Sequence, residues 1–569
     1  MSPTTKALRS VGIALSMLLF PTPGLQSSAV AAERIYASYA PLESSISVAA
    51  LEIYAKEGKI DKDLAALARY LNPQQLAQLR RVLLNRIKLS PVAVSQFLYT
   101  PIGETLLERL GQVIQTGSRQ PGFYALRAAL ILAAADPQEG LTLLNVLRRF
   151  PTASIRVNLR SSLQIFEELE QMIDQTNQAI ALLEQQSAAT TAMLPINFSQ
   201  LPDLRRRGRF TWHKQTLTLY ARRQSRRILA DIYFPRTQAP VPVIVISHGL
   251  GSDRSSFKYL ATQLASYGFA VAVPEHPGSN AAQLRSLLAG QSNRVTEAQE
   301  FINRPLDVKY LLDELERLDK SDSSFQLNVQ QVGVIGQSFG GYTALALAGA
   351  SLNLKQLQND CQELNDSLNV SLLLQCRALE LPATQYNLRD ERVKAAIAIN
   401  PITSSVFGQA GLSQIQIPVM LVSSSNDRVA PALSEQILPF TWLFTPQKYL
   451  VLLQGGTHFS TIGKTNPQTD ALTIPPQIIG PDSAIAHGYM KALSVAFFQT
   501  HIAGATQYRP YLSADYTQAI SQAPMSLSLV QSLPATLLTQ PAKLRSVYLE
   551  KTTPDTKAHS TSKSSNFLK

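Results

Sequence analysis

The stretch that decides the fold is VGVIGQSFGGYTALALAGA, Val332–Ala350. It opens with a short run of Val and Ile, which is typical of a buried strand, and it closes with an Ala- and Leu-rich run, which is typical of a helix. Between the two runs Ser338 stands among glycines in the pattern Gly-x-Ser-x-Gly. The pattern predicts a tight turn that lifts Ser338 above the end of a sheet, with Gly336 and Gly340 small enough to let the backbone reverse.

Strand and helix patterns alternate on both sides of this turn. Helical stretches such as SFKYLATQLASYG and RPLDVKYLLDELERL separate short apolar runs. The predicted strands lie within 210–223, 226–235, 241–249, 269–278, 331–341, 393–401, 417–427 and 448–458. This alternation predicts an α/β fold over residues 205–505, with a mostly parallel central sheet that carries its chemistry at the carboxyl ends of the strands. Residues 351–392 form an insertion after the turn, where we expect them to cap the pocket.

A serine raised in this way is a candidate nucleophile, and it needs a base and an acid. In this type of fold the three residues follow in the order serine, acid, histidine. His458 stands in a glycine-rich loop after one strand and Asp427 ends another, so we predict a catalytic set of Ser338, Asp427 and His458. The alternative interpretations are an ordinary strand-to-helix turn, a loop histidine and a turn-forming aspartate.

The backbone N–H groups of Leu250 and Phe339 are the predicted oxyanion donors. Phe339 follows the serine, and Leu250 follows His248-Gly249 in the loop after the first central strand. His248 itself is expected to organise that loop rather than to act as a base. The competing strand end for the acid carries Asn400, which is not an acid. The predicted chemistry needs no metal and no organic cofactor.

Residues 1–32 have the pattern of a secretory signal peptide. Basic residues precede an apolar run, and small residues follow it, which predicts cleavage after Ala31 or Ala32. The run is too short for a permanent membrane span, although an uncleaved anchor is the alternative interpretation. We therefore expect an exported protein of the periplasm or the extracellular space, or of the thylakoid lumen if the source is a cyanobacterium.

The rest of the chain is expected to divide into several parts, because 569 residues exceed what one core holds. Asn-Pro, Ser-Pro and Thr-Pro pairs mark helix starts in the N-terminal part, and an amphipathic pattern over 162–186 predicts a long helix there. The predicted parts are an all-α domain over 33–190, a linker over 191–204, the α/β domain, and a C-terminal extension over 506–569 with a disordered end.

Charge and cysteine usage limit the classes of partner. The formal net charge is +12, but no motif typical of nucleic-acid recognition accompanies it, so we predict no nucleic-acid partner. Nine basic residues lie within 205–227, which is either a solvated face or a surface for anionic membrane lipid.

The two cysteines, Cys361 and Cys376, are either two buried thiols or one disulfide. A disulfide that closes a loop of about 15 residues contributes about 3 kcal/mol to the stability of the fold. Two cysteines alone make a poor metal site.

Residues 205–505 resemble the α/β-hydrolase superfamily, and within it the platelet-activating-factor acetylhydrolase and dienelactone-hydrolase-like groups. The resemblance is carried by SHGLGSDRSSFKYLATQLASYGFAVAVPEHPGS, GVIGQSFGG, LVSSSNDRVAP and GGTHFS. It implies a serine-dependent, calcium-independent ester hydrolase with Ser338 as nucleophile and His458 as base, and with Leu250 and Phe339 as oxyanion donors. The N-terminal part is similar to a helical domain of unknown function that precedes such hydrolases in cyanobacteria, and that likeness implies no chemistry.

Two positions depart from the acetylhydrolase pattern. Gln337 replaces the histidine that often precedes the serine, and Asn400 stands where the eukaryotic acetylhydrolases keep their acid. The acid is therefore expected at Asp427, and the resemblance does not extend to the narrow acetylhydrolase substrate. Dienelactone hydrolases use a cysteine nucleophile, so only their fold carries over.

The sequence as a whole predicts a carboxylic-ester hydrolase that works through an acyl-enzyme and acts on a small-molecule or lipid ester, phospholipid acyl esters included. Two other classes stay open. One is a non-catalytic envelope or lipid-binding protein that kept the hydrolase fold, and the other is a serine peptidase of the same fold.

Overall fold

The computed structural model describes residues 31–39, 42–191, 197–221, 225–322, 325–362, 364, 367–463 and 476–534. The chain divides into two compact units, Met1–Val94 with Leu110–Ser162, and Ser95–Arg109 with Leu163–Lys569, and each is considered by itself. Most of the predicted signal peptide, part of the predicted linker and the end of the C-terminal extension lie outside the described residues. The predicted domain limits stay predictions.

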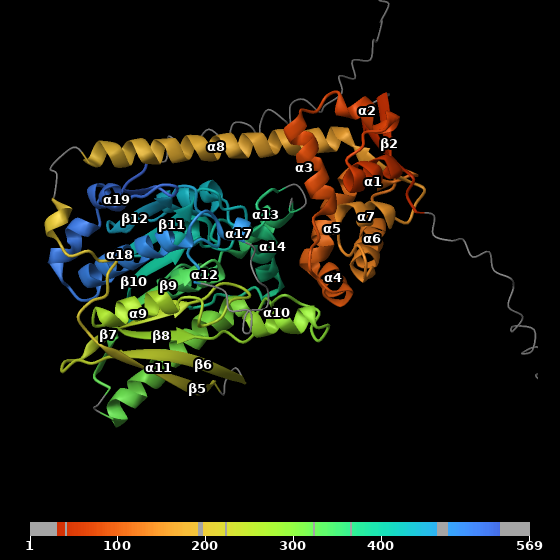
Figure 1. The fold of residues 1–569 in the computed structure, drawn as a ribbon. Helices are drawn as coiled ribbons and strands as arrows, with labels where there is room; N and C mark the ends of the chain where they lie inside the picture. The colour runs from red at the N-terminus through yellow and green to blue at the C-terminus, as the bar shows by residue number, and fades with distance from the viewer. Residues whose placement is uncertain are drawn as a thin grey trace, which may run out of the picture. The chain divides into compact units, whose positions relative to one another are not determined.

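The first unit contains a small sheet that the sequence analysis did not predict (Figure 1). Its strands pair in the order β2-β1-β4-β3, and they are β1 (Arg34–Tyr39), β2 (Leu42–Ser47), β3 (Ile114–Thr116) and β4 (Ser154–Asn158). The expectation of an all-α domain is therefore wrong. The strands are short, and β1 pairs in parallel with β4 from more than a hundred residues away. A long-range pairing of this kind leaves no periodic signal in either local sequence.

The helices of the N-terminal part begin where the proline pairs predict them. Asn72 caps α3 (Pro73–Leu84) through a capping box with Gln75. Ser90 and Thr100 accept backbone N–H groups at the starts of α4 (Pro91–Leu98) and α5 (Pro101–Val113). The other helices are α1 (Val48–Glu57), α2 (Lys62–Ala68), α6 (Phe123–Ala135), α7 (Leu143–Arg148) and the long α8 (Leu159–Thr191). A small core packs α1, α2, α3 and α7 together around Leu51, Leu64, Leu83 and Leu144.

The second unit is built on a sheet of nine strands in the order β13-β12-β11-β10-β9-β7-β8-β6-β5. The strands are β5 (Trp212–Ala221), β6 (Arg226–Pro235), β7 (Val241–Ser247), β8 (Ala270–Pro274), β9 (Leu327–Gln337), β10 (Val393–Ile399), β11 (Val419–Ser424), β12 (Lys448–Leu453) and β13 (Leu527–Val530). The six strands from β12 to β8 are parallel, and β5, β6 and β13 run antiparallel to their neighbours. The prediction of an α/β protein with a mostly parallel sheet is confirmed.

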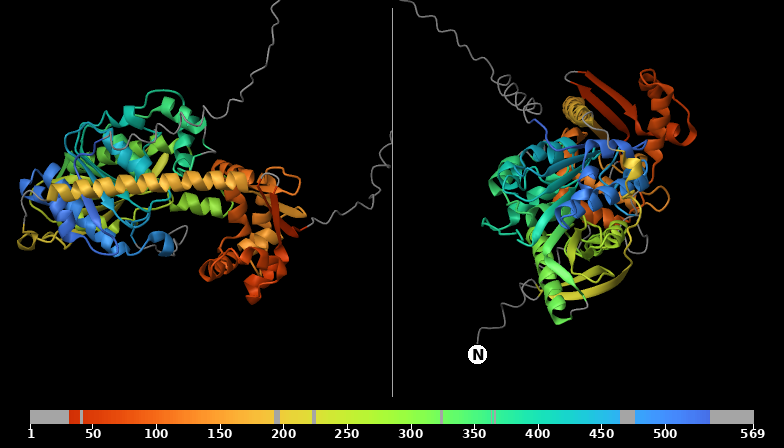
Figure 2. Two further views of the ribbon diagram at one scale, coloured as in Figure 1. Left: turned by 90° about the horizontal axis from the view of Figure 1, so that it is seen from above. Right: turned by 90° about the vertical axis from the view of Figure 1, so that its left-hand side faces the viewer.

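Helices cover both faces of this sheet (Figures 1 and 2). Val243 and Val245 of β7 point to one face, where α11, α12 and the C-terminal half of α8 pack, and Ile244 and Ile246 point to the other, where α9 and α18 pack. The helices are α9 (Lys258–Ser266), α10 (Ala281–Leu288), α11 (Glu300–Ser321), α12 (Phe339–Leu347), α13 (Leu354–Gln362), α14 (Leu372–Gln375), α15 (Gly408–Leu412), α16 (Leu438–Thr441), α17 (Pro476–Ile479), α18 (Ser483–His501) and α19 (Ala514–Ile520). In the part of the chain that the structure describes, no helix combines the length and the apolar character needed to cross a bilayer.

The basic stretch 205–227 is partly paired inside the protein. Arg226 is partly buried and forms ion pairs with Glu300 and Asp307 of α11. Two further pairs are Arg205 with Asp203 and Lys214 with Asp231. Arg222 and Arg223 lie outside the described residues. These pairs give Arg205, Lys214 and Arg226 partners within the protein, and contact of the stretch with anionic membrane lipid stays a prediction.

Candidate active site

Ser338 lies in the turn between β9 and α12, in a backbone conformation that few residues adopt. Its φ is 56° and its ψ is −117°. The turn is held in place because the N–H of Ser338 donates to the carbonyl of Ile399 on β10 at 2.9 Å. A Cβ on Gly336 would lie 1.8 Å from the carbonyl oxygen of Gly340, and a Cβ on Gly340 would lie 2.0 Å from that of Ser247. Only glycine fits at these two positions, and the strained turn leaves Ser338 8% exposed.

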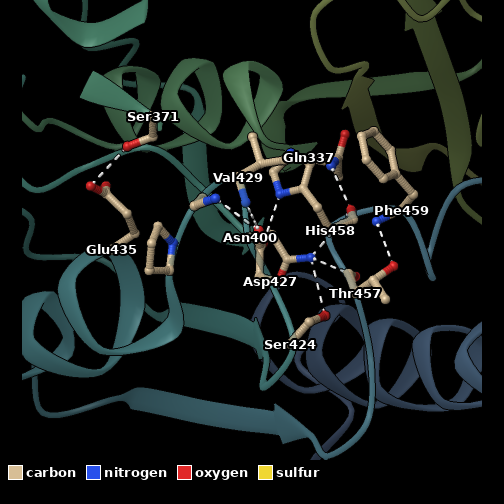
Figure 3. A network of polar contacts seen from close by, with 12 residues as sticks. Gln337, Ser371, Asn400, Ser424, Asp427, Val429, Glu435, Thr457, His458 and Phe459 are labelled. Carbon is tan, nitrogen blue, oxygen red and sulfur yellow. Dashed lines mark hydrogen bonds and ion pairs between the residues drawn. The ribbon is translucent and has the colours of Figure 1, made fainter. Parts of the chain in front are cut away.

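Asp427 and His458 form a hydrogen-bonded pair at neighbouring strand ends (Figure 3). Asp427 follows β11, and its Oδ1 accepts the N–H groups of Val429 and Ala430, both at 2.8 Å. Its Oδ2 accepts Nδ1–H of His458, which follows β12, at 2.6 Å. The two backbone bonds fix the carboxylate plane. The carboxylate in turn selects the imidazole tautomer in which Nε2 carries no proton, and this is the form that can act as a base.

The loop of His458 is fastened to the serine turn by the side chain of Gln337. Gln337 immediately precedes Ser338, and its Nε2 donates to the carbonyl of His458 at 3.1 Å. Asn400 donates to the same carbonyl at 3.4 Å and to Ser424 Oγ at 3.1 Å (Figure 3). Among the hydrogen bonds of the described residues, none joins Ser338 to His458, as is common before substrate binds. The two residues that depart from the acetylhydrolase pattern therefore both hold the backbone of His458.

Leu250 and Phe339 carry backbone N–H groups that are free within the described part of the chain, where neither donates a hydrogen bond to another protein group. Leu250 follows β7, and Phe339 is the first residue of α12. A Cβ on Gly249 would lie 2.4 Å from Oε1 of Gln337, so the loop after β7 passes very close to the serine turn. Free N–H groups on two adjoining loops at the carboxyl end of the sheet suit the stabilisation of an oxyanion.

A second set of serine, histidine and aspartate is joined by hydrogen bonds, and the sequence analysis missed this set. Ser247 Oγ lies 3.0 Å from His276 Nε2, and His276 Nδ1 lies 3.1 Å from Asp307 Oδ2. The connectivity is consistent with a catalytic triad. The three residues are buried, with exposed fractions of 2%, 0% and 0%. Ser247 carries no Gly-x-Ser-x-Gly signal, and only the pairing of β7 with β8 brings it beside His276, so no local pattern could have found this set.

Burial determines the protonation of His276 and Asp307 in this second set and of the neighbouring His248. Burial lowers the pKa of His276 well below 6.5, and the positive charge of Arg304 lowers it further. Burial raises the pKa of Asp307 to about 7, although the ion pair with Arg226 opposes the rise. Burial also lowers the pKa of His248 to about 3. Both imidazoles are therefore neutral at neutral pH.

A cavity of about 800 Å³ reaches the pair formed by His458 and Asp427. Loops after β11 and β12 line one side, and an apolar stripe of α8 with Leu169, Met172 and Ile173 lines the other. A larger cavity, of about 1340 Å³, lies at the amino ends of the parallel strands and contains no candidate residue. The smaller cavity is the better candidate for a substrate site, because the candidate base and an apolar wall meet in it. Among the described residues, no group of three or more His, Cys, Asp or Glu side chains is arranged to hold a metal ion.

The insertion after α12 is tied to the strand ends beside the site. A disulfide joins Cys361 to Cys376 within it. Glu435, which is fully buried, accepts hydrogen bonds from Asn369, Ser371 and Gln375 of the insertion and from the N–H groups of Thr403 and Ser404 after β10. Figure 3 shows the bond from Ser371. One carboxylate thus fixes the insertion to the loop that follows Asn400.

Two family models match separate parts of the chain. Residues 31–158 match the family described as alpha/beta hydrolase of unknown function (DUF1400), and residues 228–310 match platelet-activating factor acetylhydrolase, isoform II. The second match covers β7, β8 and the loop that carries Leu250. The resemblance to α/β-hydrolases of the acetylhydrolase group is confirmed.

Curated relatives agree with this resemblance at a distance. The platelet-activating factor acetylhydrolase of Cavia porcellus is 26% identical over 272 residues, which are 47% of this chain and 59% of that protein. The Bos taurus protein of the same name is 24% identical over 280 residues, which are 47% of this chain and 58% of that protein. The Canis lupus familiaris protein is 30% identical over an alignment of 148 residues, which covers 19% of this chain and 32% of that protein. The chain thus spans less than two thirds of each of these relatives.

Proposed function

We propose that this protein is a serine hydrolase that cleaves carboxylic esters through an acyl-enzyme on Ser338. The observation that carries the proposal is the strained turn at Ser338, fastened through Gln337 to the loop of His458, whose imidazole is oriented by Asp427. The distant likeness to platelet-activating factor acetylhydrolases, which are ester hydrolases, supports the reaction class.

In the proposed mechanism the residues of the site act in both half-reactions, the acylation of Ser338 and its deacylation. His458 Nε2 takes the proton of Ser338 Oγ as the oxygen attacks the ester carbonyl, and Asp427 stabilises the imidazolium that forms. The N–H groups of Leu250 and Phe339 donate to the oxyanion. His458 then gives the proton to the leaving alcohol. In the second half it activates the water that releases the acyl group from the serine.

We assign the nucleophile to Ser338 rather than Ser247 on backbone conformation and access. Ser247 is the last residue of β7, its Oγ is bonded to His276, and the pair is enclosed by the core. An ester could reach it only if the sheet opened. Ser338 is also buried, but its exposed fraction is 8% against 2% for Ser247, and the base assigned to it lines a cavity.

We propose an ester with an apolar acyl chain as the substrate. Leu169 and Ile173 of α8 are 37% and 47% exposed although they are large and apolar, and both line the cavity at His458. An acyl chain laid against this stripe would remove apolar surface from water, which stabilises the complex by roughly 25 cal/mol per Å².

A fluorophosphonate probe tests the proposed nucleophile directly. The full-length wild-type protein should be labelled, and peptide mapping should find the adduct on Ser338. An adduct on Ser247 would assign the activity to the set of Ser247, His276 and Asp307. If the protein were not labelled and hydrolysed no ester, it would be a non-catalytic protein.

A panel of p-nitrophenyl esters from acetyl to palmitoyl tests the substrate class. Leu169→Ser and Ile173→Ser should raise KM for long acyl chains and leave the acetyl ester unchanged. Leu163→Ser is the matched control, because Leu163 is an exposed leucine of the same helix that does not line the cavity. Equal effects of all three changes would remove α8 from the substrate site.

A further inference from the structure

Arg304 is a buried cation beside the two loops that carry the predicted oxyanion donors. It lies on α11 and is 0% exposed. In the described part of the chain its guanidinium forms no direct ion pair, and a buried charge without one is costly unless dipoles surround it. Burial lowers the pKa of Arg304 to about 9, with Glu300 and Asp307 acting against that change, so the guanidinium stays protonated at neutral pH.

The guanidinium donates to the backbone of the loop after β7. Nη1 donates to the carbonyl of His248 at 2.8 Å, and Nη2 donates to that of Gly249 at 3.4 Å. His248 Nε2 accepts the N–H of His276 at 3.1 Å, so the proton of His248 is on Nδ1, which donates to the same Gly249 carbonyl at 2.8 Å. The backbone N–H of Ser252 also donates to this carbonyl, at 3.3 Å. The Gly249 carbonyl is thus held by three donors, of which the guanidinium is the charged one.

This carbonyl belongs to the peptide group whose N–H is that of Leu250. In a planar trans peptide the C=O and N–H bonds point in opposite directions, so a fixed carbonyl fixes the direction of the N–H. Donors on the carbonyl also polarise the amide and strengthen its N–H as a donor, because hydrogen bonds in a chain reinforce one another. The guanidinium therefore acts on Leu250 through Gly249.

The same guanidinium covers the side chain of the second donor residue. Its Cζ lies 4.5 Å from the ring centroid of Phe339, a cation–π contact in a desolvated place. The ring is fully buried, with an edge-to-face contact to Phe301 at 4.8 Å. Arg304 is itself fixed by Ser279, whose Oγ accepts from Nε at 2.8 Å and donates to Glu300 at 2.9 Å.

We propose that Arg304 is a positioning residue that holds both oxyanion donors, Leu250 through the Gly249 carbonyl and Phe339 through its ring, and polarises the first of them. The catalytic consequence rests on the proposed ester hydrolysis. The positioning itself can be measured without any substrate.

The test compares Arg304→Met and Arg304→Lys with the control Arg226→Met in the full-length protein. Arg226 lies in the same buried charge network, paired with Glu300 and Asp307, but it contacts neither donor residue. Arg304→Met should lower kcat on a soluble ester by about 100-fold or more with little change in KM, as loss of one oxyanion donor does. Arg304→Lys keeps the charge but lacks the fork of donors, so its kcat should lie between those of Arg304→Met and the wild type. Arg226→Met should lower the thermal midpoint and leave kcat of the folded protein near the wild-type value.

Amide hydrogen exchange, read by mass spectrometry, gives the second readout. Peptides that contain Leu250 and Phe339 should exchange faster in both Arg304 variants and not in Arg226→Met. The proposal would be overturned if a folded Arg304→Lys protein had the same kcat and the same amide exchange as the wild type. Equal losses of kcat in the Arg304 and Arg226 variants would also overturn it. If the wild-type protein hydrolysed no ester, the proposed function would fail, whereas faster exchange at both donor segments would still support the positioning. Should Arg304→Met not fold, the Lys variant decides by the same two readouts.

Discussion

Two serine–histidine–aspartate sets lie at the carboxyl edge of one sheet, and they share little beyond residue type. In the set of Ser247, His276 and Asp307 both hydrogen bonds are closed, at 3.0 Å and 3.1 Å, whereas in the other set only His458 and Asp427 are joined. If complete bonding marked a nucleophile, Ser247 would be the better candidate. Ser247, however, has an ordinary strand backbone, and Ser338 has a φ of 56°.

If Ser338 is the nucleophile, as we propose, the difference teaches that backbone strain and access identify a reactive serine better than connectivity does. Strain at Ser338 has no structural benefit of its own, because an unstrained turn would join β9 to α12 at lower cost. The closed set has a structural account that does not require chemistry. It links β7, β8 and α11 and connects onward to Arg226 and, through His276, to His248 in the loop that carries Leu250.

The largest expected effect separates the two serines. Ser338→Ala should reduce kcat/KM for a soluble ester on the order of 10⁵-fold or more, because the nucleophile is lost. Ser247→Ala removes one buried hydrogen bond and should cost about 1 kcal/mol of unfolding free energy with little loss of rate. Steady-state kinetics and urea unfolding on both variants give the two quantities. The reverse pattern, with activity lost in Ser247→Ala and kept in Ser338→Ala, would exchange the roles of the two sets.

A second, smaller effect separates the two aspartates. Asp427→Asn should lower kcat about 10⁴-fold, because the amide no longer favours the correct tautomer of His458 or stabilises its cation. Asp307→Asn is the matched control at the buried set, where burial already raises the pKa of the carboxyl to about 7. Its kcat should stay within roughly tenfold of the wild type. Full activity of Asp427→Asn would show that another acid orients the base.

The same comparison shows which parts of the molecule the sequence could predict. Eight of the nine strands of the large sheet and the serine turn are local features, because short apolar runs and a glycine-flanked serine carry their own signals. The ninth strand, β13, was not predicted. The pairing of β1 with β4, the chain from Ser247 to Asp307 and the contacts of Arg304 are formed between segments far apart in the sequence. The roles of Gln337 and Asn400 were equally hidden. Each looked like a departure from a family pattern, and only the fold shows that both donate to the carbonyl of His458.

The smallest expected effect is on acid stability, and it tests whether the buried set is held neutral by burial. The folded-state pKa of His276 is lowered, so the unfolded chain binds a proton first as the pH falls below about 6.5, and stability falls by about 1.4 kcal/mol per pH unit. The folded-state pKa of Asp307 is raised to about 7, so its contribution has the opposite sign. Asp307 stabilises the folded protein at pH 4, and that stabilisation is lost as the pH rises to 7.

Asp307→Asn removes this compensation. Between pH 7 and about pH 4 the variant should lose stability on acidification more steeply than the wild type, by about 1.4 kcal/mol per pH unit. Urea midpoints measured across this range, at unchanged denaturant slope, give the difference directly. Parallel pH profiles for the two proteins would mean that Asp307 is already ionised in the folded state at these pH values, with Arg226 as its counter-charge. The buried set would then place a carboxylate beside a neutral imidazole, as an active triad does before reaction. The argument that separates it from Ser338, Asp427 and His458 would rest on access and backbone strain alone.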